Sequence, residues 1–535
     1  MGSFAITYDD FTGGHYMGDK SAATPSNTWY GTNALLNSQG ELIPGSTVLW
    51  NTFPNPGSLI NGNIKDAWLD KRYGSTYCVV TYEDGSWPST NYSTYLVECD
   101  TDGNYVVSTN STLLTGVIGG VPGGLRSFGV WHAQQSKYYY IDGLNGPNPG
   151  QIRAVNFAAD SLVSSALTSD PMENLTIYKF RMLAWKENGN KFYYSDNTMS
   201  TWSTSDYYEL SGGIFALIPR SNDLVAVTSE GVYSITGVLG SSVNIQQIGP
   251  PNELVLGLER AVANGRSLVF VSENDKTSPV LSEWLGATSN EVARFSQADI
   301  NEYSSNTNTF HLDVNVLSNG QTAVAFDNGV MYLKNPSGSW QRLYHQISQS
   351  GTSGKVVIPT EYVNFWDTSG STPSQETYAM LLVTDNDNDA TRFYKYKIGG
   401  FLPSGTYENT YPSPYTSPFS ATVKMSEYWH QKPMNVREIL VEAVYDRDDL
   451  LKLNGNATVS VQVLPVGAVD YEVNDTSALT STTQTYTTTI SSVNNDNSRV
   501  LHRFRTDDAV KAYGFSPQIT WQGCRIRRVI AVCED

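Results

Sequence analysis

The chain has 535 residues, a length that predicts about three domains, or two if one of them is a large closed all-β body. Hydrophobic residues make up 40% of it, enough for a folded core, which excludes wholesale disorder. The 34 Lys and Arg against 52 Asp and Glu give a net charge of −18. This charge excludes binding to DNA or anionic membranes through the whole surface, although it leaves room for a local basic patch.

The first residues, MGSFAITYDDFTGG, contain neither the basic nor the apolar region of a secretory signal. No stretch approaches the roughly 18 apolar residues of a membrane span. We therefore expect a soluble protein without a membrane segment.

The cysteines and histidines show no local site. Four cysteines are too few for a disulfide framework in a chain of this length, and buried free thiols are the favoured interpretation. Cys78 and Cys99 each lie in an expected strand and could be neighbours across a sheet. The six histidines are scattered singly, which leaves open only a zinc site assembled from distant residues: His15, His132, His311, His345, His430 and His502.

Strand signals dominate the whole chain. Runs rich in Val, Ile, Tyr, Phe and Thr recur at intervals of about ten residues between Gly, Asn, Asp and Ser, whereas helical periodicity is nearly absent. In 181–196, residues 187–190 connect two apolar runs, and Asn188–Gly189 supplies the positive φ of a tight turn. The pattern predicts an all-β fold of the sandwich, barrel or propeller kind.

The hairpins predict four segments. Residues 1–50 are expected to form an N-terminal extended arm and the start of a propeller. In 51–400, about seven units with a period near 50 residues predict a β-propeller of about six or seven blades. Four prolines mark 401–420 as an extended linker, and about six alternating strands in 421–535 predict a C-terminal β-sandwich. Within it, the Thr-rich segment 477–492 is either a mobile loop or an edge hairpin.

Three motifs are similar to known sites but are interpreted as turns or loops. Asp385, Asp387 and Asp389 alternate like calcium ligands, but Ala390 and Tyr396 replace the required Gly and Glu, so we expect a solvated hairpin tip. The Gly-rich run at 119–124 precedes a strand-like segment instead of the helix of a nucleotide site, and we interpret it as a loop between blades.

The third motif contains Ser195, Asp196 and Trp202, which are similar to an Asp-box turn of sialidase-type propellers but lack its Gly. A glycosidase would need two carboxylates brought together in space, and the sequence singles out no such pair. We therefore nominate no catalytic, cofactor-binding or metal residue, and we expect neither a cofactor nor an enzyme.

The opening segment combines an aromatic residue and a Gly-Gly pair, then Pro and Asn, a further Asn, and a Gly-x-Leu turn: Phe11, Gly13, Gly14, Pro25, Asn27, Asn33, Gly40 and Leu42. This pattern resembles the amino terminus of bacteriophage tail nozzle and related minor tail proteins. Segments 190–202, 222–237, 426–443 and 512–532 are similar to later parts of the same family, so the resemblance covers most of the chain. It departs at 43–45, where the family commonly has Arg-Gly and this chain has Ile-Pro-Gly.

The resemblance implies a structural virion protein in the tail of a short-tailed phage. It implies a ring, expected to hold six copies, that lies below the portal or adaptor, contacts tail fibre proteins and surrounds the channel through which DNA leaves. A lumen lined with carboxylates would let DNA pass without specific binding.

Two alternatives remain open. The first is a receptor- or glycan-binding tail protein or lectin-like propeller, which a patch of exposed Trp and Tyr on one propeller face would favour. The second is a hydrolase of the sialidase or glycosidase kind. Turnover of glycosides that is lost when one acidic residue is replaced would favour it.

Overall fold

The computed structural model describes residues 3–17, 28–37, 39–53, 62–70, 76–84, 91–99, 112–113, 118–119, 129–132, 137–141, 152–156, 161–163, 172–186, 188–198, 201–250, 261–272, 279–286, 288–295, 312–317, 320–326, 330–335, 338–344, 356–357, 364–367, 374–386, 390–398, 420–445, 457–468, 485–490, 492–493, 495, 497–506 and 512–534. The strands between 46 and 119 and between 356 and 398 are described by their backbone only. Every regular element in these ranges is a β-strand, so the all-β prediction is confirmed for the described part of the chain.

Four antiparallel sheets follow one another along the chain, each with four strands paired in chain order. Their strands are β11 (Gly129–His132), β12 (Lys137–Ile141), β13 (Ile152–Asn156) and β14 (Ser161–Val163); β15 (Asn174–Tyr178), β16 (Arg181–Trp185), β17 (Lys191–Ser195) and β18 (Trp202–Glu209); β19 (Ile214–Pro219), β20 (Leu224–Thr228), β21 (Val232–Val238) and β22 (Ser242–Gly249); and β23 (Ala261–Asn264), β24 (Ser267–Ser272), β25 (Val280–Trp284) and β26 (Ser289–Arg294).

Three further groups of strands have a related pairing. In the first, β27 (Leu312–Val316), β28 (Thr322–Phe326), β29 (Val330–Lys334) and β30 (Trp340–Tyr344) pair in chain order. The second holds β6 (Gly62–Asp70), β7 (Thr76–Asp84) and β8 (Asn91–Cys99), with β9 (Thr112–Leu113) and β10 (Ile118–Gly119) both on β8. The third holds β31 (Val356–Val357), β32 (Asn364–Asp367), β33 (Ser374–Asn386), β34 (Ala390–Ile398) and, from the N-terminal part of the chain, β5 (Leu42–Phe53).

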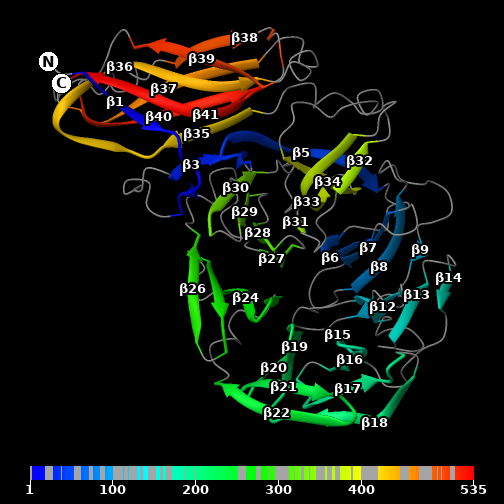
Figure 1. Cartoon of the computed structure of the whole chain (residues 1–535). Coiled ribbons are helices and arrows are strands. Elements are labelled where there is room, and N and C mark those ends of the chain that lie inside the picture. Colours follow the sequence, from blue (N-terminus) through cyan, green and yellow to red (C-terminus); the bar gives the residue numbers. More distant parts are fainter. Residues whose placement is uncertain are drawn as a thin grey trace.

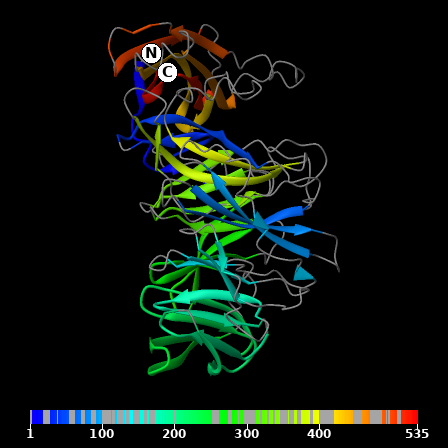
Figure 2. The ribbon, with the colours of Figure 1, turned by 90° about the vertical axis from the view of Figure 1, so that its right-hand side faces the viewer.

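The sheets follow one another around a common centre (Figure 1). The first strands of consecutive sheets contact each other in order: β11 with β15, β15 with β19, β19 with β23, and β23 with β27. Their last strands, such as β18, β22 and β26, lie at the periphery in the same view. Seen from the side, the molecule is elongated, with the C-terminal strands at one end and the sheets around β15–β22 at the other (Figure 2).

Apolar clusters lie between neighbouring sheets, so each sheet buries both of its faces. All five residues of β20 and all five of β28 are buried. Neither strand alternates apolar and polar residues, as expected for a strand that is covered on both faces. One cluster joins sheet β15–β18 to sheet β19–β22 through Trp185, Phe192 and Leu224. The next joins sheet β19–β22 to sheet β23–β26 through Val225 and Trp284. Burial on both faces explains why these strands are nearly continuous hydrophobic runs.

The C-terminal strands form two layers around one core. They are β35 (Ser420–Met425), β36 (Tyr428–Tyr445), β37 (Ala457–Ala468), β38 (Thr485–Ile490), β39 (Ser498–Arg505), β40 (Ala512–Gln522) and β41 (Arg525–Glu534). One layer has the order β39–β36–β41–β1, in which β1 is Ser3–Tyr8, and the other has the order β38–β37–β40–β35. The largest apolar cluster of the described residues lies between them, with Ile439, Val459 and Trp521 among its members.

The N-terminal strands connect this C-terminal part with the sheets. β2 (Gly14–His15) pairs in parallel with β30 and with β3 (Thr28–Thr32), and β3 pairs antiparallel with β35. β4 (Ala34–Leu36) pairs with the start of β5, whose later residues pair with β34. Residues 1–50, expected to form an arm, thus supply paired strands to the C-terminal layers and to sheet β27–β30.

Several expectations about single segments are settled. Cys78 and Cys99 do lie on paired strands, but they are not opposite each other, because Cys78 pairs with Val97 and Cys99 with Thr76. Residues 485–490 of the Thr-rich segment form β38, a strand with only β37 as its partner among the described residues. The segment after the Gly-rich run is the strand β11, as expected, whereas most of that run and of the linker 401–420 lie outside the described residues.

Candidate functional site

The turn after β17 contains the residues that are similar to an Asp-box, and the contacts within it are those of a stabilised turn. The Asp196 carboxylate accepts hydrogen bonds from the Thr198 hydroxyl at 2.7 Å and from the Thr201 backbone N–H at 3.2 Å. The buried Ser195 hydroxyl accepts one from the Met182 N–H at 3.0 Å, and Trp202 pairs with Ser195 across the hairpin. The carboxylate therefore holds the turn between β17 and β18.

The calcium-like Asp run lies at a hairpin, as expected. β33 and β34 pair up to Asn386 and Ala390, so the connection between them begins after Asn386. Asp385 belongs to β33, whereas Asp387 and Asp389 lie outside the described residues. Within the described ranges, no group of three or more His, Cys, Asp and Glu is placed to hold a metal ion.

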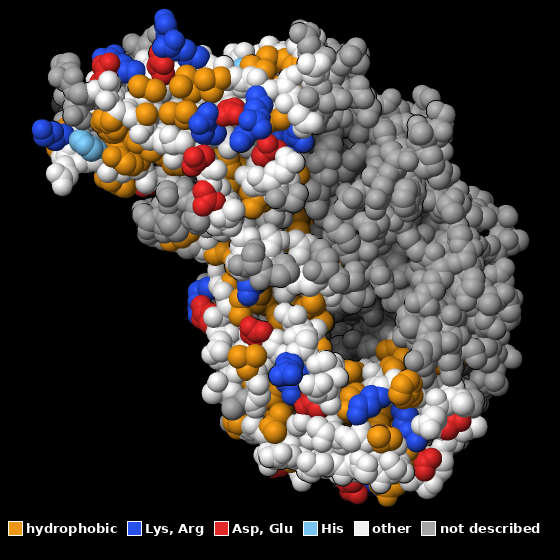
Figure 3. All heavy atoms as spheres, in the orientation of Figure 1, with side chains coloured by type: hydrophobic (Ala, Val, Ile, Leu, Met, Phe, Trp, Pro, Cys, Tyr) orange, Lys and Arg blue, Asp and Glu red, His pale blue; other side chains and the backbone are white. Residues whose placement is uncertain are grey.

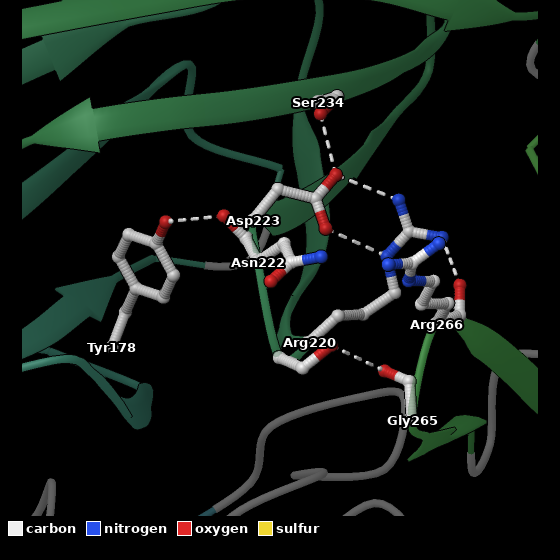
Figure 4. A network of polar contacts seen from close by, with 8 residues as sticks. Tyr178, Arg220, Asn222, Asp223, Ser234, Gly265 and Arg266 are labelled. Carbon is white, nitrogen blue, oxygen red and sulfur yellow. Dashed lines mark hydrogen bonds and ion pairs between the residues drawn. The ribbon is translucent and has the colours of Figure 1, made fainter.

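A polar network at the turn between β19 and β20 links three consecutive sheets (Figure 4). Arg220 donates to both carboxylate oxygens of Asp223, at 2.8 and 2.6 Å, and Ser234 of β21 donates to the same carboxylate at 2.5 Å. Arg220 also donates to the Arg266 backbone carbonyl at 2.5 Å, which belongs to the β23–β24 turn. From the preceding sheet, the hydroxyl of Tyr178 donates to the Asn222 carbonyl at 3.4 Å.

The Arg220–Asp223 pair is shielded from water, since its side chains are 11% and 10% exposed. Burial by itself raises the pKa of Asp223. The hydrogen bonds from Arg220 and Ser234 and the charge of Arg220 together outweigh this effect, so the pKa of Asp223 lies below its ordinary value. The Arg220 guanidinium also lies 5.6 Å from the ring centre of Trp284. From the sequence, Arg220 and Asp223 look like residues of an ordinary turn. Their further partners, Ser234 and the Arg266 carbonyl, lie on other hairpins and become visible only in the structure.

The junction between sheet β27–β30 and the N-terminal strands contains a buried arginine. Arg342 of β30 has no exposed surface, and its guanidinium donates to the Tyr30 hydroxyl at 3.1 Å. Its backbone carbonyl accepts from the Asn33 N–H at 3.1 Å. His15, 2% exposed, accepts from the Gly31 N–H at 3.3 Å and lies against Tyr30 and Tyr332. These contacts fix β2 and β3 against β30.

A second buried polar group lies inside the C-terminal layers. The Tyr445 hydroxyl and the His502 Nε2 are 2.6 Å apart, and burial lowers the pKa of His502. Burial also raises the pKa of the Cys524 thiol to about 12, which keeps it protonated and unreactive near neutral pH. Cys524 and Cys533 are free and buried, as expected.

The outer face of the layer β39–β36–β41–β1 carries an excess of arginine. Glu438 of β36 forms ion pairs with Arg503 and, at 3.8 Å, with Arg505. Glu442, four residues further along β36, pairs with Arg528 at 2.7 Å and Arg527 at 3.9 Å. Each glutamate thus faces two guanidinium groups, which makes this face positive although the chain as a whole is negative. Figure 3 shows basic, acidic and apolar side chains side by side on the upper body.

Large apolar side chains that are exposed lie on separate elements in the described part of the chain. Phe180 lies in the β15–β16 turn, Tyr207 on β18, and Trp429 and Leu501 on β36 and β39. Among the described residues, no long apolar helix capable of crossing a bilayer is found.

A scan against protein-family models finds no match, and a search of curated proteins also finds none. Among solved structures, Kluyveromyces lactis Hsv2 is similar at 8% identity with a TM-score of 0.32, over 63% of this chain and 98% of that one. An acylaminoacyl peptidase from Pyrococcus horikoshii is similar at 10% identity with a TM-score of 0.32, over 62% of this chain and 52% of that one. At these values neither protein assigns a function to the chain.

Proposed function

We propose that the chain is a structural virion protein, a tail nozzle of a short-tailed phage that forms part of the DNA exit channel and has no enzymatic role. In this proposal, seven groups of strands form a seven-bladed β-propeller: β6–β10, β11–β14, β15–β18, β19–β22, β23–β26, β27–β30 and β31–β34 with β5. The layers formed mainly by β35–β41 are the C-terminal β-sandwich.

The observation that carries the proposal is the way in which the N-terminal strands join the two parts. Backbone pairing runs without interruption from β30 through β2 and β3 to β35, and β5 adds the outer strand to β34. The pairing through β2 and β3 thus extends from sheet β27–β30 into the C-terminal part. A part that must keep its shape while DNA passes needs such a connection, because a flexible linker would let the domains move independently. The resemblance of the opening segment to the tail nozzle family supports the same function.

The distribution of charge agrees with a channel protein. Residues 1–419 contain 22 Lys and Arg against 38 Asp and Glu, and 420–535 contain 12 against 14. The negative charge therefore belongs to the part proposed as the propeller. Carboxylates on a channel wall repel phosphate and keep DNA from binding with counterion release.

Electron microscopy of the purified full-length chain tests this function. We expect closed rings with a central opening wide enough for duplex DNA and six copies in each. Chains that remain single at micromolar concentration in a virion-like buffer, or rings without an opening, contradict the proposal.

Two activity measurements on the same preparation separate the alternatives. Turnover of chromogenic glycosides that is lost when one acidic residue is replaced identifies a hydrolase. Saturable binding to a defined glycan without turnover identifies a receptor-binding protein. We expect neither.

A further inference from the structure

We propose that the outer face of the layer β39–β36–β41–β1 is the surface by which one copy of this chain binds the acidic part of a second copy. This inference rests on the proposed function and names the surface by which the ring would close. We call this surface the arginine face, and its residues are Ser3, Ala5, Thr7, Glu438, Leu440, Glu442, Arg499, Leu501, Arg503, Arg505, Arg527, Arg528, Ile530, Val532 and Glu534.

Strand register places these side chains on one side of the layer. Leu440 pairs with Arg503 on one neighbour and with Ile530 on the other, and Ile530 pairs in turn with Thr7. Their sequence neighbours, such as Ile439 and Phe504, point into the core. Residues opposite one another in an antiparallel pair share a face, so the register defines the arginine face without further assumptions.

Apolar side chains occupy the middle of the arginine face. Leu501 is 54% exposed, and Leu440, Ile530 and Val532 remain partly exposed on a layer whose other side is mostly buried. An apolar centre within a charged rim that is rich in arginine is typical of protein–protein interfaces. A face that only meets water would gain nothing from this apolar centre.

The arginine face also has guanidinium groups in excess. Arg503 and Arg505, 56% and 70% exposed, share the single carboxylate of Glu438, and Arg527 and Arg528 share that of Glu442. One carboxylate neutralises one charge, so each group retains a net positive charge. Exposed Arg499 adds another. Guanidinium groups bind carboxylates through paired, charge-assisted hydrogen bonds, which makes acidic side chains the suited partner.

The remainder of the same chain supplies that partner. Residues 1–419 have 38 acidic against 22 basic side chains, so every copy that carries an arginine face also carries an excess of carboxylates in the rest of the chain. Asp206 and Glu209 of the peripheral strand β18 are examples, at the end of the molecule far from the C-terminal layers. Because the two surfaces differ and belong to one chain, their contact is head-to-tail, the kind that closes into a ring.

Duplex DNA is a poorer occupant. Glu438 and Glu442 lie within the arginine face, and their carboxylates would approach the phosphates as closely as the arginines do. A protein surface can place a basic group opposite each glutamate, whereas a phosphate backbone cannot.

The test compares the self-association of full-length variants by sedimentation velocity. Replacing both Arg503→Glu and Arg505→Glu is expected to weaken association by at least about tenfold at low salt, because both guanidinium charges beside Glu438 are reversed. Leu501→Asp, which introduces a carboxylate into the apolar centre without cutting any ion pair, is expected to weaken it comparably. The matched control, Lys424→Glu with Lys432→Glu, makes the same charge change outside the arginine face and outside residues 1–419, and is expected to leave association within about twofold.

Electron images of the same samples keep this inference separate from the proposed function. Rings that persist in both arginine-face variants overturn the inference and leave the function standing. Head-to-tail filaments that the variants dissolve, without rings in the wild type, support the inference and contradict the function. Absence of any self-association overturns the inference, and so does wild-type binding of a short DNA duplex, followed by fluorescence anisotropy, that the arginine variants lose. Thermal unfolding of each variant checks that it folds.

Discussion

Asp223 is the residue that holds Arg220 at the contact between two sheets. Its carboxylate accepts from Arg220 and Ser234, and Arg220 extends the contact to the Arg266 carbonyl of the next sheet. A buried ion pair contributes little over an apolar pair of the same shape, but removing one partner leaves the other charge buried without compensation. Asp223 thus neutralises the charge of Arg220 at the buried position from which Arg220 also binds the Arg266 carbonyl of the next sheet.

We expect Asp223→Ala to lower the free energy of unfolding by about 3 kcal/mol, because Arg220 then stays buried without a carboxylate. Urea denaturation followed by tryptophan fluorescence measures this loss. Glu291→Ala is the matched control: Glu291 also pairs with an arginine three residues away, Arg294, but their side chains are about half exposed. Its loss is expected to be below about 1 kcal/mol, and equal losses for both variants would contradict the role of burial.

The same carboxylate gives a pH dependence with a definite sign. The pKa of Asp223 is lowered in the folded chain, so its contribution is fully present above the ordinary aspartate pKa of about 3.9 and is lost as pH falls through the folded value. We expect the stability difference between wild type and Asp223→Asn to be largest near about pH 7 and to shrink below about pH 4. Urea titrations at several pH values measure it. A difference that grows toward acid pH would show that the pKa is raised instead.

At the scale of elements, the first strand is an edge that covers part of the C-terminal core. β1 pairs with β41 alone among the described strands, and its Phe4 lies opposite Cys533. Cys533 has no exposed surface, and burial raises its pKa to about 12. Cys524 is equally buried but lies away from β1, beside Tyr445. The two thiols thus report on different regions of one core.

Deleting residues 1–8 is expected to raise the alkylation rate of Cys533 at least about tenfold, because loss of β1 opens that edge of the layer and frees the thiol to ionise. Mass spectrometry of peptides after timed iodoacetamide treatment measures each cysteine separately. Cys524 is the internal control and is expected to stay slow. If both thiols become reactive together, the deletion has unfolded the whole C-terminal part, and the local role of β1 is wrong.

Local turns and strands were predictable from the sequence because their signals are local. The turn between β16 and β17 lies where the Asn188–Gly189 pair predicts it. Within that pair, Asn188 takes the left-handed conformation, at φ 60°. Asn tolerates this region better than other residues with a side chain, and its N–H donates to the Ile214 carbonyl of the next sheet at 3.2 Å. The pattern identifies the turn, but a partner on another sheet decides which residue adopts the positive φ.

Long-range pairing was not predictable in the same way. The run 42–53 reads as one strand among many, and nothing within it indicates pairing with β34. Likewise β2 has only two residues, Gly14 and His15, too few for any periodicity, yet it joins β3 to β30. The excess of arginine on β39 and β41 is visible in the sequence, but only the register shows that Glu438 and Glu442 lie between them. The candidate surface therefore needed the structure.

For the whole molecule, β3 is one of two strands through which the C-terminal part and the sheets are joined; the other is β5, which pairs with β41 at Leu42 and with β34 further along. Gly31 lies so close to β35 that an added Cβ would come against the Thr422 carbonyl oxygen, nearer than non-bonded atoms approach. The neighbouring Tyr30 contacts Arg342 of β30. Gly31 thus lies in the contact made by β3, with the backbone of β35 directly against the side where a Cβ would be.

We expect Gly31→Val to separate β3 from β35 and to weaken the coupling of the two parts, which β5 still joins, without unfolding either. Differential scanning calorimetry is expected to show two resolved transitions in the variant, where the wild type shows a more cooperative one. Gly265→Ala is a control for a glycine substitution elsewhere: an added Cβ meets no atom there, but its φ of 60° is strained, so it is expected to shift a transition without splitting it. A single transition in Gly31→Val would contradict the connecting role of β3.

Pairing between the two ends of the chain also constrains how the protein is made. A ribosome releases residues 1–53 well before residues 390–534, yet the partners of β1, β3 and β5 lie in β41, β35 and β34. During translation these early strands have open edges that can pair with any neighbouring polypeptide on the same messenger RNA. Nascent chains of this protein therefore need protection until β41 has emerged from the ribosome, and slow elongation before that point would lower the yield of native product.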